Sequence, residues 1–156
     1  MVPITARARA IWHTSVWLAV FLACVSSASA FELVTPAEAA LPPGKVPSAA
    51  VRGSPTRRPS INVISPSGLG AIYSPVDFKV RFSAFGGAAI DPDTVVVTYV
   101  KQPDIDITAR IKAFITADGI DVARAEVPPG LHQFWIELKD SNGNFNGREV
   151  EFLVLK

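Results

Sequence analysis

Residues 126–144, EVPPGLHQFWIELKDSNGN, contain the pattern that decides the fold. A Pro-Pro-Gly corner comes first, the alternating segment LHQFWIELK (131–139) follows, and the polar sequence DSNGN ends the stretch. Successive side chains of a β-strand point to opposite faces of the sheet, so Phe134, Ile136 and Leu138 would face a core. The stretch therefore predicts a half-buried strand between two turns.

The same pattern of short strands between turns continues through the C-terminal part of the chain. The segment VDFKVRFSAF (76–85) alternates apolar and polar residues most regularly. Further strands are predicted at residues 61–65, 94–100, 120–127 and 148–155. Residues 106–114 have helical spacing instead and are expected to form one or two helical turns, with an aligned strand as the alternative. About seven short strands of this kind indicate an all-β sandwich.

Two stretches resemble bacterial immunoglobulin-like and fibronectin type III-like modules. They are PSINVISPSG (59–68) and PPGLHQFWIELKDSNGN (128–144), and the resemblance covers residues 59–156. It implies an immunoglobulin-like antiparallel β-sandwich of about seven strands. Such modules are mostly stalks, spacers and binding domains of exported proteins, so the resemblance implies a role in binding or support. Since one fold hosts many functions, this is an argument by analogy.

The first thirty residues have the features of a signal peptide. Two arginines precede an apolar run at residues 16–25, and Ala28-Ser29-Ala30 offers small residues to a signal peptidase. We therefore predict cleavage before Phe31 and a periplasmic or extracellular location. A membrane anchor is the alternative, but the apolar run is only about half of the roughly 20 residues that a spanning helix needs.

Cys24 is the only cysteine in the chain. A lipid anchor at Cys24 is a second alternative, although Leu22 lies one position closer to the cysteine than lipoprotein signals favour. Cleavage before Phe31 would remove Cys24 and leave a mature chain without a thiol. Such a chain could form no disulfide in an oxidising compartment, and its stability would depend on a packed core.

The composition divides the mature chain near residue 60. Residues 31–60 are rich in Pro, Ala and Ser and lack a sustained period, which predicts a flexible, disordered tether. Residues 61–156 would form the sandwich domain. This part contains nine Lys or Arg and twelve Asp or Glu residues, and a negative net charge argues against nucleic acid as the partner.

His132 and Gly130 belong to the Pro-Pro-Gly corner. His132 follows Gly130 by two residues, where related sandwiches often place a tyrosine whose hydroxyl binds a nearby backbone group. A ring nitrogen of His132 can do the same, so we predict a structural role. A zinc or copper site is disfavoured because the mature chain offers neither a second histidine nor a cysteine.

The polar turn after this strand partly matches a calcium-binding loop. Asp140, Asn142 and Asn144 occupy the first, third and fifth places of such a loop, and Glu151 occupies the twelfth. The sixth place, which needs glycine for the sharp turn, is Phe145. An ordinary hairpin turn is therefore the favoured interpretation, the first three residues are weak calcium candidates, and neither metal nor cofactor is expected.

Trp135 points away from the predicted core, because it alternates with Phe134 and Ile136. If the strands pair in the usual sandwich order, its outward neighbours form a candidate partner-binding stripe with it: Val96, Val100 and Leu153. An exposed apolar stripe marks a partner surface. The alternative is that residues 107–114 fold over the stripe and bury it.

The expected function is that of an exported, non-enzymatic module that binds or supports another envelope or secreted protein. The sequence contains no nucleophile elbow, phosphate-binding loop or paired metal motif, which favours a protein without catalytic activity. Two alternatives remain: a calcium-dependent binding module, and an accessory subunit of an envelope enzyme complex.

Overall fold

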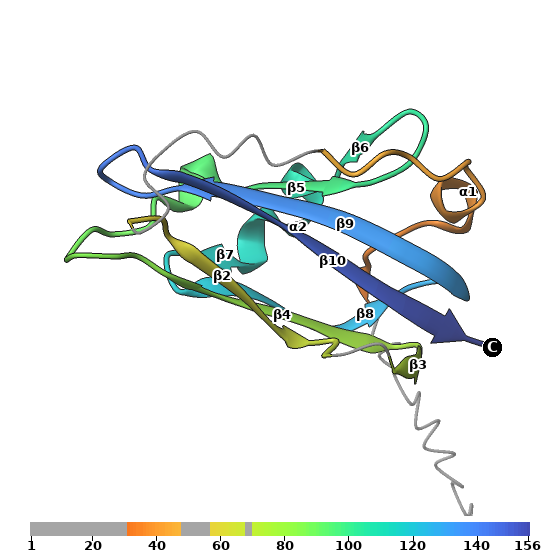
Figure 1. The fold of residues 1–156 in the computed structure, drawn as a ribbon. Coiled ribbons are helices and arrows are strands. Elements are labelled where there is room, and N and C mark those ends of the chain that lie inside the picture. Colours follow the sequence, from red (N-terminus) through yellow and green to blue (C-terminus); the bar gives the residue numbers. More distant parts are fainter. Residues whose placement is uncertain (1–30, 48–56, 68–69) are drawn as a thin grey trace, which may run out of the picture.

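The computed structural model describes residues 31–47, 57–67 and 70–156, so the predicted signal peptide and Cys24 lie outside the described residues. The fold consists of two β-sheets that face each other across a shared core (Figure 1). The order of strands in the first sheet is β1-β8-β4-β2, with the short β7 also paired to β8. These strands span Phe31–Glu32 (β1), Gly119–Glu126 (β8), Val76–Ser83 (β4), Ser60–Ser65 (β2) and Ile115–Thr116 (β7).

The second sheet has the order β3-β10-β9-β5-β6. Its strands span Ala71–Tyr73 (β3), Phe145–Leu155 (β10), Gly130–Lys139 (β9), Val96–Tyr99 (β5) and Ile105–Asp106 (β6). The long hairpin of β9 and β10 forms its centre (Figure 1). The described residues also contain four short helical segments: Pro36–Ala39 (α1), Pro92–Thr94 (η1), Thr108–Ile111 (α2) and Lys112–Phe114 (η2).

The core forms because both sheets turn their alternating apolar residues inward. Every second residue of β4, from Val76 to Phe82, is buried, and the residues between them are exposed. Phe134 lies at the centre, with ring centroids 5.0 Å from Tyr99, 5.5 Å from Phe78 and 5.7 Å from Phe152. These rings come from four strands in both sheets, so burying them holds the two layers together.

The prediction of an all-β fold is confirmed, and each of the predicted strands is present with small shifts at its ends. Residues 108–114 form helical turns, as their spacing predicts, and Ile107 and Ile111 are part of the core. The expectation of a purely antiparallel sandwich is wrong. The strands β1 and β3 each run parallel to their neighbours, β8 and β10, so both sheets are mixed.

The prediction of a tether is wrong for residues 31–47, because the folded unit includes these residues and is not confined to residues 61–156. Leu33 and Val34 are fully buried in the core, and β1 pairs with β8. Apolar residues that are scattered in the sequence still contribute to a core when the chain lays them against an existing one. We call residues 31–47 the N-terminal strap.

Candidate interaction surface

The outward face of the second sheet is defined by the pairing of β9 with its neighbours. Trp135 pairs with Glu149 on β10 and with Thr98 on β5, while Leu131 pairs with Leu153. Paired residues in a sheet point to the same side. All of these side chains therefore lie on the face opposite the core, as the alternation of the sequence predicts.

Trp135 is nevertheless only 6% exposed, and the prediction that it anchors an open stripe is wrong. Its ring lies on Gly147 of β10, where an added Cβ atom would overlap with the indole. The indole nitrogen donates to a carboxylate oxygen of Glu137 at 3.2 Å. The strap residues Val46 and Pro47 line the same hollow as Trp135, together with residues 58–62 and 146–149.

Val100 is also buried, and Val96 is half-buried, so neither residue offers the open surface predicted for it. The strap runs beside Val100: the backbone N–H of Gly44 donates to its carbonyl at 3.4 Å. Pro43 forms a bridge with Lys101 next to it. The predicted alternative cover is wrong too, since Ile107 and Ile111 pack inside the core.

Lys101 fastens the strap at the end of α1. Its Nζ donates to the carbonyl oxygens of Ala39 at 2.9 Å and of Leu41 at 3.2 Å. Its charge also lies 5.2 Å from the centre of the Tyr99 ring. A cation at a helix C-terminus satisfies carbonyl groups that lack partners within the helix.

A second fastening joins α1 to α2. Both terminal nitrogens of Arg110 donate to the Glu38 carboxylate, at 2.6 and 3.0 Å, and one of them also donates to the carbonyl of Leu33 at 2.7 Å. The hydrogen bond from Arg110 lowers the pKa of Glu38 from 4.5 to about 2. Sequence reasoning missed this pair, although Thr35 and Glu38 form a capping box whose spacing predicts a helix start.

Four large apolar side chains remain exposed at the other end of the same face. They are Tyr73 (65%), Leu131 (55%), Leu153 (40%) and Leu155 (37%), and we call them the open patch. The register joins them directly, because Leu153 pairs with Leu131 and Leu155 pairs with Tyr73. Of the predicted partner-binding residues, only Leu153 belongs to this patch. Of the others, Tyr73 lies on β3, which was not predicted, whereas Leu131 and Leu155 lie in predicted strands and were not assigned to the stripe.

His132 fixes the corner that leads into Leu131. The ring is buried, and Nε2 donates to the carbonyl of Pro128 at 2.8 Å, as predicted for a corner residue. Since a carbonyl only accepts, Nε2 carries the proton and Nδ1 accepts from the Tyr99 hydroxyl at 2.9 Å. Burial lowers the pKa of His132, and the nearby Lys101 charge acts in the same direction. The ring is thus held neutral.

The corner borders a small hollow of about 300 Å³ beside the open patch. Leu131 forms one wall, and Ala39 and Pro43 of the strap form another, with Val100 also contributing to the lining. The strap and the corner therefore shape a mostly apolar recess next to Leu131. Such a recess suits an apolar side chain of a partner protein.

The weak calcium candidates form a hairpin turn. Oδ1 of Asp140 accepts from the backbone N–H groups of Asn142 at 2.9 Å and of Asn144 at 2.8 Å, and Oδ2 accepts from the Asn144 side chain at 2.9 Å. Gly143 has a φ of 77°, which the turn requires. Across the described residues, no three His, Cys, Asp or Glu side chains gather to hold a metal ion.

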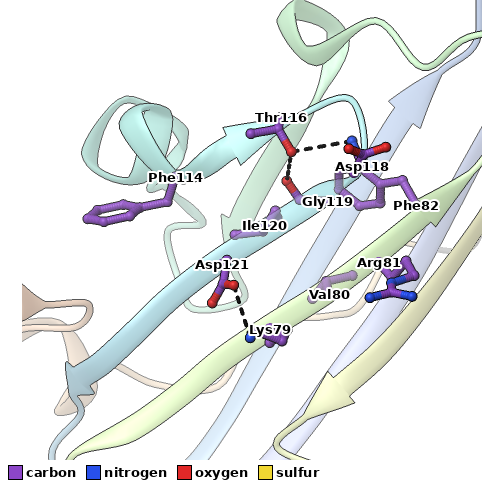
Figure 2. Close-up of a pocket in the computed structure, with 10 residues that line it drawn as sticks. All are labelled: Lys79, Val80, Arg81, Phe82, Phe114, Thr116, Asp118, Gly119, Ile120 and Asp121. Carbon is purple, nitrogen blue, oxygen red and sulfur yellow. Dashed lines mark hydrogen bonds and ion pairs between the residues drawn. The ribbon is translucent and has the colours of Figure 1, made fainter.

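A second hollow, of about 410 Å³, lies on the first sheet near the turn between β7 and β8 (Figure 2). Lys79 on β4 forms an ion pair with Asp121 on β8, with Nζ 3.0 Å from Oδ2, and a dashed line marks this pair in Figure 2. The Thr116 hydroxyl donates to the carbonyl of Gly119 and accepts from the N–H of Asp118. These contacts close a turn and join two strands, so they have a structural explanation.

Comparisons of the chain with protein-family models, with curated proteins and with solved structures found no match. Within the three described ranges, no helix is long and apolar enough to cross a membrane. The open patch and the corner beside it are therefore interpreted from their own geometry.

Proposed function

We propose that this chain is an exported, non-enzymatic, immunoglobulin-like module that binds another protein through the open patch. The observation that carries the proposal is the patch itself. It contains four of the six large apolar side chains that are exposed in the described residues, on three neighbouring strands of one face. Contiguous exposed apolar surface of this kind marks interaction sites.

The order of the strands supports the immunoglobulin-like assignment. In that fold, strands A, B and E share one sheet and strands C, F and G share the other. Here β2, β4 and β8 are neighbours in the first sheet, and β5, β9 and β10 are neighbours in the second. The corner before β9 corresponds to the place where that fold pins strand F, and His132 holds it here.

The pattern of residues 1–30 supports export. Phe31, the first residue after the proposed cleavage site, lies in β1, so cleavage there would retain this strand and its pairing with β8. N-terminal sequencing and intact mass of the exported protein test this step. A mature chain that begins at Phe31 is expected, whereas a lipid-modified Cys24 at the N-terminus would contradict it.

Capture of the partner tests the binding role. The double substitution Leu131→Ser/Leu153→Ser removes the centre of the patch, and Ile64→Ser/Phe85→Ser removes two equally exposed apolar side chains elsewhere. Both proteins would be used, after cross-linking, to capture partners from an extract of the cells that produce the chain. Truncating central anchors commonly costs about 2 kcal/mol or more, which is roughly a thirtyfold loss of affinity.

We expect the patch variant to lose the captured protein and the control variant to retain it. Equal capture by both variants, each with an unchanged melting temperature, would contradict the proposal.

A further inference from the structure

The outward positions of β10 change from acidic to apolar along the strand. Glu149 and Glu151 come first, and Leu153 and Leu155 of the open patch follow. Alternate residues of one strand lie about 7 Å apart on the same face, so these four side chains form a single row. Two carboxylates therefore lie directly beside the open patch in the same row.

The neighbouring strand does not neutralise this row. Gln133 lies beside it, and its Nε2 donates to Glu151 at 2.6 Å and to Glu149 at 3.4 Å. Further along β9, Glu137 adds a third carboxylate to this face. Lys139 is the one cation among the outward positions of β9. Arg58 and Arg148 line the hollow near Glu149. Glu151 is the carboxylate that borders the patch most closely, because it is the outward residue just before Leu153 on β10.

We propose that the partner presents a linear segment in which a group of apolar side chains lies next to Lys or Arg. The segment lies along β10, with its apolar residues on Leu153 and Leu155 and its cations over Glu151 and Glu149. This inference rests on the function proposed above and adds the chemistry of the partner. Complementary charge decides which part of the segment lies on which part of the row, in either chain direction, because the opposite placement would put cations on leucines.

The same charges argue against two other occupants. A second copy whose row covered this whole row would place its carboxylates either on carboxylates or on leucines, and both arrangements are unfavourable. An anionic lipid surface would be repelled by the same groups. A basic and apolar protein segment is the occupant that both halves of the row favour.

Selection from a phage-displayed library of random peptides tests the inference with a defined probe. The wild-type chain is the target, and the affinity of the consensus peptide is then measured for the wild type and three variants. These are Glu149→Gln/Glu151→Gln, the patch variant Leu131→Ser/Leu153→Ser, and the matched control Glu32→Gln/Glu126→Gln. The control removes the same amount of negative charge as the Glu149→Gln/Glu151→Gln variant. Its two carboxylates are exposed and are paired on neighbouring strands of the first sheet.

We expect selected peptides with Lys or Arg beside Leu or an aromatic residue. Exposed ion pairs contribute little each, so Glu149→Gln/Glu151→Gln should weaken binding about three- to tenfold, and the control should not. Binding to the wild type should also weaken as salt is added. Neutral or acidic consensus peptides, or equal affinity for the Gln variant, would overturn the inference.

The outcomes also separate the inference from the function on which it rests. A neutral peptide that is lost with the patch variant would leave the open patch as a binding site and refute only the basic partner. A peptide that binds the patch variant as well as the wild type would refute both. Sedimentation of the wild type as a dimer that the patch variant does not form would assign the patch to a second copy and overturn the inference.

Discussion

The two halves of the outward face of the second sheet have the same backbone pattern and different surroundings. In one half, Trp135 lies on Gly147 with the strap residues Val46 and Pro47 beside it. In the other half, Leu131 and Leu153 are paired in the same register and remain exposed. The residues that surround the strand, rather than the strand itself, decide which half of the face is buried and which half is exposed.

The two halves therefore contribute to different free energies, one to that of folding and the other to that of association. Burial of the covered half contributes to folding, because its apolar area is removed from water when the chain folds. The open half leaves comparable area in water, so it contributes to association only when a partner covers it. Substitutions in the two halves should therefore affect different measurements.

The largest effect is expected in the covered half. Trp135→Ala removes a buried indole and should lower the free energy of unfolding by about 3 kcal/mol. Chemical denaturation measures this loss, and partner capture by the remaining folded protein should be unchanged. A stable variant that no longer captures the partner would make Trp135 a binding residue and would erase the distinction between the halves.

A smaller effect is expected where the strap is fastened. Glu38→Gln leaves Arg110 without its carboxylate and weakens the capping box, so a loss of about 1–2 kcal/mol is expected in the free energy of unfolding. Lys112→Gln is the matched control, because it breaks the exposed ion pair with Asp93. Equal stability of both variants would show that the strap is not held by Arg110.

Acidification should weaken the same region in two steps. Folding lowers the pKa of His132, so the unfolded chain binds more protons below its ordinary value of 6.5, and stability falls as the pH drops below that value. Folding also lowers the pKa of Glu38 to about 2, so its contribution is present above pH 4.5 and is lost between 4.5 and about 2.

Melting temperatures measured across this range test both steps. Glu38→Gln should reduce the part of the pH dependence that lies between 4.5 and 2, to which Asp93 and Asp140 also contribute because their pKa values are lowered too. A wild-type chain whose melting temperature stays constant from pH 7 to pH 4 would contradict the assignment of His132 as a neutral, buried corner residue.

The smallest effect on stability is expected in the open half. Leu153→Ser changes an exposed side chain, so the free energy of unfolding should change by no more than about 0.5 kcal/mol. A loss of several times this size would show that the patch is part of the packing. The same chemical denaturation that is used for Trp135→Ala makes the comparison direct.

The strands and the core could be predicted because they depend on local alternation. The turn at Asp140 and the corner at His132 could be predicted as well, since their residue types specify the backbone shape. The direction in which Trp135 points was also predicted correctly. These features all arise within a few residues of one another in the sequence.

The cover over Trp135 could not be predicted in the same way. It depends on Gly147, whose missing side chain makes room for the ring, and the strap residues Val46 and Pro47 that line the same hollow lie about 90 positions earlier in the sequence. The short strand β3 also lacked a signal, since its three residues show no alternation to detect. Contacts that arise from tertiary packing override the local pattern.

Photo-cross-linking from a single position tests the central claim most directly. A photoreactive phenylalanine analogue would replace Leu153 in the open patch or, as a control, Phe85, which is exposed outside it. The chains would be irradiated in the cells that produce them, and adducts would be detected by their mass. If the open patch binds a partner, a specific adduct is expected from position 153 and none from position 85. No adduct at 153, or the same adducts from both positions, would contradict this claim.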